Sequence, residues 1–256
     1  GRQYLIQQTI LQNDLRTKEI EFQDFINHGY WPLNCSAYSL LELHNDLLKR
    51  SIVPLRVLIA KTEVTAFDRA KRDSSYDIFV NKVKDSLSEL PNISILDRPW
   101  KNASQSTICD SMNLHFIMQG VPTLLVFPYQ IGDQFGIEIS MWSFVRGAHS
   151  MQSRKILKIN SFDATKNIDH VVLALKAAIG MTRDTYMIAE YHSPARFISM
   201  IDETILEIEE IRHMIIGHYS ELINAVMKNQ EYRSICAHHE LEEIVDSLSY
   251  IKQITV

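Results

Sequence analysis

The chain has 256 residues, a net charge of −5 and the mixed composition of an ordinary globular protein. The negative charge argues against a surface that attracts nucleic acid over its whole extent, although a local basic patch stays open. Cys35, Cys109 and Cys236 lie far apart, which favours free thiols in a reducing compartment and provides no paired ligands for zinc.

The sequence also lacks the signals of membrane insertion or secretion. No apolar run reaches the roughly 18 residues that suggest a membrane span. The N-terminal residues Gly-Arg-Gln-Tyr-Leu-Ile-Gln-Gln do not form the apolar core of a signal peptide. We therefore expect a cytoplasmic protein without a membrane partner.

The first 52 residues predict a helical N-terminal segment. Apolar residues recur at helical spacing over residues 4–28 and again over 36–50, where Leu40, Leu43 and Leu47 build one stripe. Gly29 separates the two stretches.

Between residues 53 and 165, short apolar runs alternate with amphipathic stretches. The runs have the length and branched residues of buried strands, and the stretches have the period of helices. Alternation of this kind predicts an α/β domain with a mostly parallel sheet of four or five strands and flanking helices. The expected strands lie at 55–60, 93–96, 121–127 and 155–159, and the expected helices lie at 76–90, 106–119 and 136–148.

Residues 166–256 show no strand signal and predict a helical C-terminal domain, a bundle. The longest expected helix, at 196–227, has an isoleucine stripe that serves either the protein's own core or a contact with a partner protein or a second copy. The other helices are expected at 168–179, ending at Gly180, at 183–191 and at 231–251.

The loops at the carboxyl ends of the predicted strands are the expected ligand site. After the third strand comes Asp133-Gln134-Phe135-Gly136-Ile137-Glu138, which we expect to lead into the helix at 136–148. A carboxylate at Glu138 can bind ribose hydroxyls or stabilise an oxocarbenium-like centre. The ordinary alternative is a carboxylate that caps and solvates the first turn of a helix.

The order of elements from Val57 to Ile159, together with this segment, resembles the nucleoside 2-deoxyribosyltransferase-like family and the TIR domain family. The first family carries an Asp-x-Gly-Thr-x-x-Glu pattern, whereas the present segment is one residue shorter and has no threonine. Lys155 fits the basic residue before the next strand. Members cleave or exchange N-glycosidic bonds, and some act in anti-phage defence. The resemblance implies a hydrolase of NAD or a related nucleotide, with Glu138 as catalytic carboxylate and Asp133 as a second one.

Other residues near the strand ends suit a nucleotide. An aromatic side chain can stack on a base, and basic or hydroxyl side chains in the first loop can bind phosphate. Core packing and a solvated surface are the ordinary alternatives for these residues. NAD would be a substrate, so neither a cofactor nor a metal is expected. The candidate binding residues are Lys61, Thr62, Arg69, Tyr129, Phe135 and Trp142.

Two further hypotheses concern the C-terminal helices. Arg212 and His218, followed by Tyr219, match the Arg-x(4–6)-His pattern of HEPN ribonucleases, in which histidine moves protons and arginine stabilises a phosphorane. Six positions on a straight helix separate two side chains by about 120°, so a shared site needs a bend or a partner subunit. The alternative is a pair of structural residues. The third hypothesis is a non-catalytic module that senses a nucleotide or assembles through these helices.

Overall fold

The computed structural model contains one five-stranded sheet within the residues that it describes. These residues are 37–62, 74–100, 121–131, 134–141, 153–158, 168–191, 195–228 and 238–253. The strands follow the order β2-β1-β3-β4-β5 across the sheet. Their bounds are β1 (Leu55–Thr62), β2 (Ile93–Trp100), β3 (Thr123–Ile131), β4 (Gln134–Met141) and β5 (Ser153–Lys158).

The sheet is mostly parallel, as expected. β1 pairs in parallel with both β2 and β3, whereas β4 pairs antiparallel with β3 on one side and β5 on the other. Because β4 opposes both of its neighbours, β5 points in the same direction as the first three strands. The prediction of an α/β fold with flanking helices and a helical C-terminal region is therefore confirmed for the described residues.

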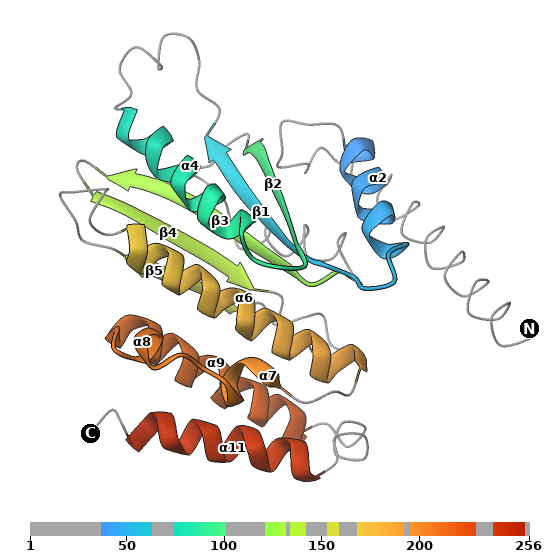
Figure 1. The fold of residues 1–256 in the computed structure, drawn as a ribbon, viewed down its shortest axis with the longest axis vertical. Coiled ribbons are helices and arrows are strands. Elements are labelled where there is room, and N and C mark those ends of the chain that lie inside the picture. The colour runs from blue at the N-terminus through green and yellow to red at the C-terminus, as the bar shows by residue number, and fades with distance from the viewer. Residues whose placement is uncertain are drawn as a thin grey trace, which may run out of the picture.

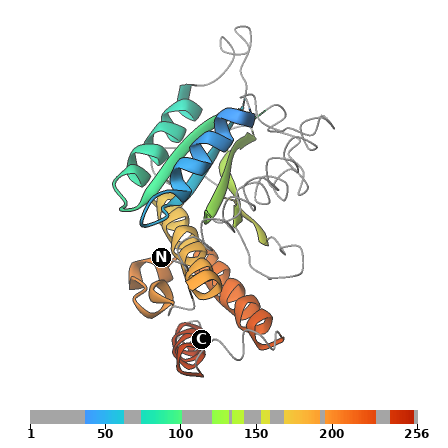
Figure 2. The same ribbon diagram turned by 90° about the vertical axis from the view of Figure 1, so that its right-hand side faces the viewer.

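Two helices cover one face of the sheet, α4 (Ser74–Ser88) and α6 (Ile168–Tyr191) (Figures 1 and 2). Alternate residues of each strand point to this face, which is the period of a half-buried strand. Burial of these side chains against the two helices contributes hydrophobic stabilisation to the sheet. The strand residues in this core are Leu55, Val57, Ile59, Leu124, Val126, Ile139 and Met141.

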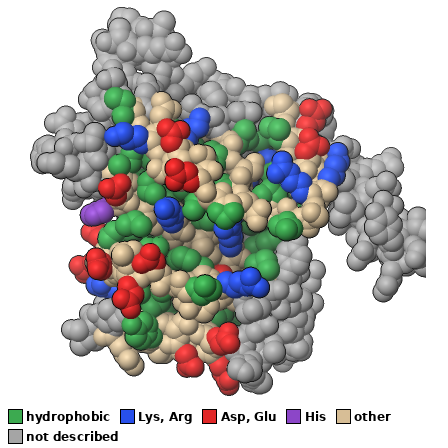
Figure 3. Space-filling model, viewed as in Figure 1, with side chains coloured by type: hydrophobic (Ala, Val, Ile, Leu, Met, Phe, Trp, Pro, Cys, Tyr) green, Lys and Arg blue, Asp and Glu red, His purple; other side chains and the backbone are tan. Residues whose placement is uncertain are grey.

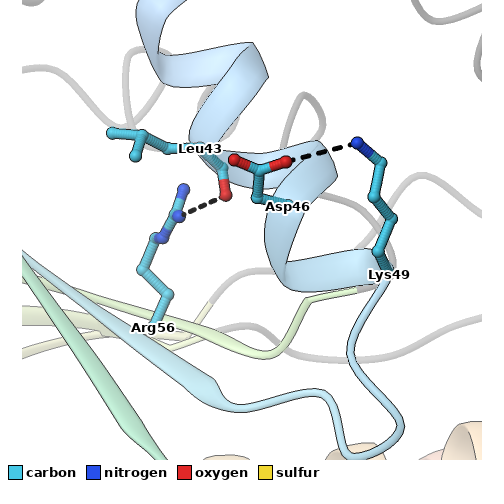
Figure 4. A network of polar contacts seen from close by, with 4 residues as sticks. All are labelled: Leu43, Asp46, Lys49 and Arg56. Carbon is cyan, nitrogen blue, oxygen red and sulfur yellow. Dashed lines mark hydrogen bonds and ion pairs between the residues drawn. The ribbon is translucent and has the colours of Figure 1, made fainter.

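The helix α2 (Ala37–Leu48) lies against the other face of the sheet. Arg56 of β1 lies on this face. Only 2% of Arg56 is exposed, and its Nη2 donates a hydrogen bond of 3.2 Å to the carbonyl oxygen of Leu43 (Figure 4). A buried guanidinium needs such acceptors because its charge has been removed from water. The nearby ion pair between Asp46 and Lys49 is exposed, so it contributes little to stability.

A third layer packs on the side of α6 that faces away from the sheet (Figure 1). One continuous hydrophobic cluster runs from Leu55 in the sheet to Ile251 in the last helix, so the sheet and the C-terminal helices share a core. The helices of this layer are α7 (Arg196–Ser199), α8 (Glu203–Leu206), α9 (Glu209–Lys228) and α11 (His238–Gln253).

Two expected features of the C-terminal helices are wrong. Helix α6 continues through Gly180, because this glycine makes room for the ring of Phe197 instead of ending the helix. The expected single helix at 196–227 is three helices. Asp202 caps α8, accepting hydrogen bonds from the backbone nitrogen and hydroxyl of Thr204 at 3.0 and 2.8 Å. These bonds hold the pKa of Asp202 below its ordinary value.

A polar junction joins the start of the sheet to α6. Asn92 has a φ of 55°, a left-handed conformation that asparagine tolerates better than most residues. Its carbonyl oxygen accepts from the backbone nitrogen of Leu55 at 3.0 Å and from the Arg183 guanidinium at 3.2 Å. The guanidinium also donates to the carbonyl oxygen of Pro91. Partial burial lowers the pKa of Arg183.

The helices expected at 4–28 and 106–119 lie outside the described residues. Within the described ranges, no helix has both the length and the apolar character needed to cross a membrane.

Candidate functional site

The carboxyl ends of three parallel strands meet at one edge of the sheet. The chain passes from β1 to β2 on one side and then to β3 on the other side of β1. In doubly wound sheets, such a reversal of strand order separates the loops on either side and opens a place for a ligand. The arrowheads of these strands point toward the upper left in Figure 1. The strand order therefore marks the end of β1 and β3 as the candidate site.

The pairing register of the strands determines which candidate residues lie side by side at this end of the sheet. Lys61 and Thr62 are the last two residues of β1. Ile59 of β1 pairs with Val126 of β3, so Lys61 is level with the residues of β3 that follow Phe127. Tyr129 occupies that carboxyl-terminal part of β3.

Glu138 lies in a strand, so the expected helix at 136–148 is wrong over its described residues. Glu138 pairs with Phe127 of β3 and with Ile156 of β5. The apolar residues of β4 recur at every second position, which is the period of a strand and not of a helix. The hairpin pairing runs to Ile131 and Gln134, leaving only two residues between the strands.

The structure thus brings part of the predicted site to one edge. Glu138 lies on β4 one strand away from Tyr129, and Phe135 pairs with Gln130 beside them. Lys61 and Thr62 belong to β1, on the other side of β3. Asp133, Arg69 and Trp142 lie outside the described residues.

Sequence reasoning missed the carboxyl half of β2. The sequence predicts a strand that ends at Leu96, but pairing with β1 continues to Trp100. Arg98 and Trp100 therefore stand beside the end of β1 and not in a loop. No alternation of polar and apolar residues marks this extension, because residues 97–100 read Asp-Arg-Pro-Trp and include a proline, which is tolerated in an edge strand such as β2.

The C-terminal candidates form a buried polar network between α6 and α9. Tyr219 is fully buried, and its hydroxyl donates a hydrogen bond of 2.6 Å to Asp184. Asp184 also accepts from the backbone nitrogens of Phe197 and Ile198, at 3.0 and 3.1 Å. One carboxylate thereby connects α6, α7 and α9. Asp184 could have been found only as a polar residue in an otherwise apolar helix.

Burial dominates the acid–base behaviour of this pair. Removal from water raises the pKa of Asp184 above its ordinary value, although the hydrogen bonds from Tyr219 and from the α7 backbone oppose the shift. Burial also raises the pKa of Tyr219 well above 10.0, and the adjacent carboxylate adds to this. Both shifts disfavour the charged forms.

His218 is also buried and lies 2.9 Å from the hydroxyl oxygen of Thr185, measured from its Nε2. The same hydroxyl donates to the carbonyl oxygen of Met181 at 2.8 Å. The Thr185 hydroxyl thus lies between the carbonyl oxygen of Met181 and the imidazole of His218. The imidazole is therefore engaged in the helix interface.

The residues of the ribonuclease hypothesis do not come together in the described chain. The Nη1 of Arg212 donates to the carbonyl oxygen of Leu206 at 2.8 Å, at the start of α9. His218 points instead into the interface with α6. On the face seen in Figure 3, acidic, basic and apolar side chains are interspersed over the described residues, without an extended basic surface of the kind that binds nucleic acid.

Among the described residues, no group of three or more His, Cys, Asp or Glu side chains is arranged to hold a metal ion. The described residues form an α/β protein in which the carboxyl ends of β1, β2 and β3 meet at one end of the sheet. Comparison with protein-family models, with curated proteins and with solved structures finds no significant match to the chain.

Proposed function

We propose that the protein binds a nucleotide at the carboxyl ends of β1 and β3 and hydrolyses its N-glycosidic bond, with NAD as the first substrate to test. The strand order β2-β1-β3 carries this proposal, because open α/β sheets bind ligands where the strand order reverses. A fold of this kind hosts many functions, so the reaction type depends on the residues at the edge.

Glu138 supplies the reaction type in this proposal. It is one strand away from β3, in register with Phe127. A carboxylate beside the ribose stabilises the positive charge that develops at the anomeric carbon as the bond to the base breaks. Water then forms the new bond to that carbon and passes a proton to the carboxylate, while the base leaves.

Thr62 and Tyr129 are the substrate-binding residues of the proposal, because strand alternation puts their positions on the same face of the sheet as Glu138. Lys61 and Phe135 were also expected to bind substrate, but their positions fall on the opposite face, with Ile59 and Ile139. A hydroxyl suits phosphate or ribose, and an aromatic ring suits a base.

The test is release of nicotinamide from NAD by the purified protein, compared with Glu138→Gln. Glutamine keeps the size of the side chain but removes the charge, so we expect turnover to fall by about 100-fold or more. Glu89→Gln is the matched control, because Glu89 is an exposed carboxylate in the turn between α4 and the amino end of β2, whereas the candidate site lies at the carboxyl ends of the parallel strands. Circular dichroism checks that both variants fold.

Retained turnover in Glu138→Gln would reject this assignment. A wild-type protein that binds NAD or another nucleotide without cleaving it would instead support the hypothesis of a non-catalytic sensor.

A further inference from the structure

A second group of chemically active residues lies at the same edge, on β2. This strand begins with apolar residues and ends with Asp97-Arg98-Pro99-Trp100. Parallel pairing sets Arg98 level with Ala60 and Trp100 level with Thr62. Positions 98 and 100, an arginine and a tryptophan, are thus paired with the last residues of β1, at the end of the sheet where the candidate site lies.

Strand alternation assigns Arg98 and Trp100 to one face of the sheet, because they are two positions apart. Their partners on β1, Ala60 and Thr62, alternate with Ile59, which packs in the core under α4 and α6. Positions 98 and 100 therefore belong to the face opposite that core.

The same alternation extends to β3 and β4. Val126 and Ile139 belong to the core face. Tyr129 is an odd number of positions from Val126, and Glu138 is adjacent to Ile139. Positions 129 and 138 therefore fall on the same face of the sheet as Arg98 and Trp100.

The positions on this face at β2 (98 and 100) are far from the position at β4 (138). β2 and β4 are separated by β1 and β3, so three steps of about 4.8 Å put their backbones roughly 14 Å apart. A ligand whose reacting ribose lies at Glu138 reaches β2 only if it continues beyond that ribose. Phosphate groups provide this extension in a nucleotide. Arginine binds them well, because its planar guanidinium can donate two parallel hydrogen bonds.

We infer that Arg98 and Trp100 form the far end of the site, where Arg98 binds a pyrophosphate and Trp100 stacks on a second base. The substrate class is therefore a dinucleotide or a similarly extended phosphorylated nucleotide, and not a free nucleoside. This inference rests on the proposed function for the position of the reacting ribose, whereas the placement of Arg98 and Trp100 follows from strand pairing.

Calorimetric titration with ADP-ribose, and separately with adenosine, tests the inference. ADP-ribose has a pyrophosphate but no nicotinamide to be cleaved. We expect Arg98→Gln to weaken ADP-ribose binding about 10- to 100-fold, as for loss of a hydrogen-bonded charge. Binding of adenosine, which lacks phosphate, should not change. Trp100→Ala should weaken both ligands.

The controls separate charge from folding. Lys82→Gln removes an exposed cation from α4 and should leave both affinities as in the wild type. Arg98→Lys keeps the charge without the planar fork, so its affinity for ADP-ribose should lie between those of wild type and Arg98→Gln. It also serves as the test variant if Arg98→Gln fails to fold.

The outcomes distinguish the inference from the proposed function. Wild-type affinity for ADP-ribose in Arg98→Gln overturns the inference, even if Glu138→Gln abolishes cleavage of NAD. Conversely, if Glu138→Gln still cleaves NAD, the catalytic assignment fails while a phosphate-specific loss in Arg98→Gln still supports the inference. A wild-type protein that binds neither ADP-ribose nor adenosine overturns both.

Discussion

Tyr219 is the residue whose chemistry is most constrained by its surroundings. It is fully buried and donates to a carboxylate that is itself 3% exposed. Hydrogen bonds between neutral donors and buried carboxylates contribute more than neutral pairs, and loss of one partner leaves a buried polar atom with fewer donors. The Asp184–Tyr219 hydrogen bond is therefore expected to contribute to the stability of the fold.

Replacing Tyr219 with phenylalanine should lower the free energy of unfolding by about 2 kcal/mol at neutral pH, because a hydrogen bond to a buried carboxylate is lost. Urea unfolding measures this. Tyr250→Phe is the control, since Tyr250 is 53% exposed on α11. Equal stability of wild type and Tyr219→Phe would contradict the importance of the bond.

The same comparison has a defined pH dependence. The folded-state pKa of Tyr219 is raised, so its stabilising effect is complete below 10.0 and is lost as pH rises from there toward the folded-state value. As the pH rises above 10.0, the hydroxyl of Tyr219 loses its proton in the unfolded chain before it does so in the folded protein. The difference in stability between wild type and Tyr219→Phe should therefore narrow above pH 10.0.

At the scale of elements, α6 and α7 pack closely because Gly180 of α6 has no side chain where the ring of Phe197 of α7 lies. A Cβ on Gly180 would overlap the ring of Phe197, and one turn later Asp184 accepts from the first backbone nitrogens of α7. The short helix α7 is thus positioned by two residues of α6 at a spacing of four, which share one helix face.

Gly180→Ala should destabilise the protein although alanine favours a helix by about 1 kcal/mol. The overlap with Phe197 is expected to cost about 1–3 kcal/mol, as for other overpacked cores. Thermal unfolding of Gly180→Ala, Phe197→Ala and the double variant measures the coupling. In the Phe197→Ala background the same alanine should be tolerated; an equal penalty in both backgrounds would show that the ring is not the cause.

The elements that the sequence predicts well are those with a local cause. The apolar runs of β1 and β3 form buried strands, and the run at β5 forms a strand, because their own residues favour that structure. β4 was predicted as a helix because apolar residues at 137, 139 and 141 adjoin Trp142, whereas the structure pairs the segment with β3. Asp202-Glu203-Thr204 is a typical helix start, but the regular spacing of isoleucines over 196–227 favoured one continuous helix, so the N-cap of α8 was not predicted.

The candidate site could be predicted only in part. The strand ends followed from the α/β pattern, so Lys61, Thr62 and Tyr129 were expected there. The level of Arg98 beside Ala60 depends on pairing register, which a single sequence does not specify. The network at Asp184 depends on contacts with residues 13 to 35 positions away, so no local pattern marks it.

At the scale of the whole molecule, the sheet and the C-terminal helices share one hydrophobic core. Helix α6 joins them, because it packs on β3 and β4 with one side and on α9 with the other, and α9 itself also contacts β5. A substitution that destabilises the C-terminal helices should therefore also destabilise the sheet.

Ile215→Ala tests this continuity. Ile215 is fully buried in α9, and truncation of such a side chain costs about 2–5 kcal/mol. We expect amide hydrogen exchange by mass spectrometry to show a similar loss of protection in β1 and in α9, since both belong to one cooperative unit. Increased exchange confined to α9 and α11 would show that the helices unfold separately.

The position of α6 also sets an order of events as the chain is made. All five strands precede α6 in the sequence, yet the core face of β3 and β4 is covered by that helix. The hydrogen bonds from Arg183 to the carbonyl oxygens of Pro91 and Asn92 likewise cannot form until Arg183 has been synthesised, more than 90 residues after the turn that they stabilise. Helix α6 therefore cannot cover this apolar face until the chain has been synthesised as far as residue 191.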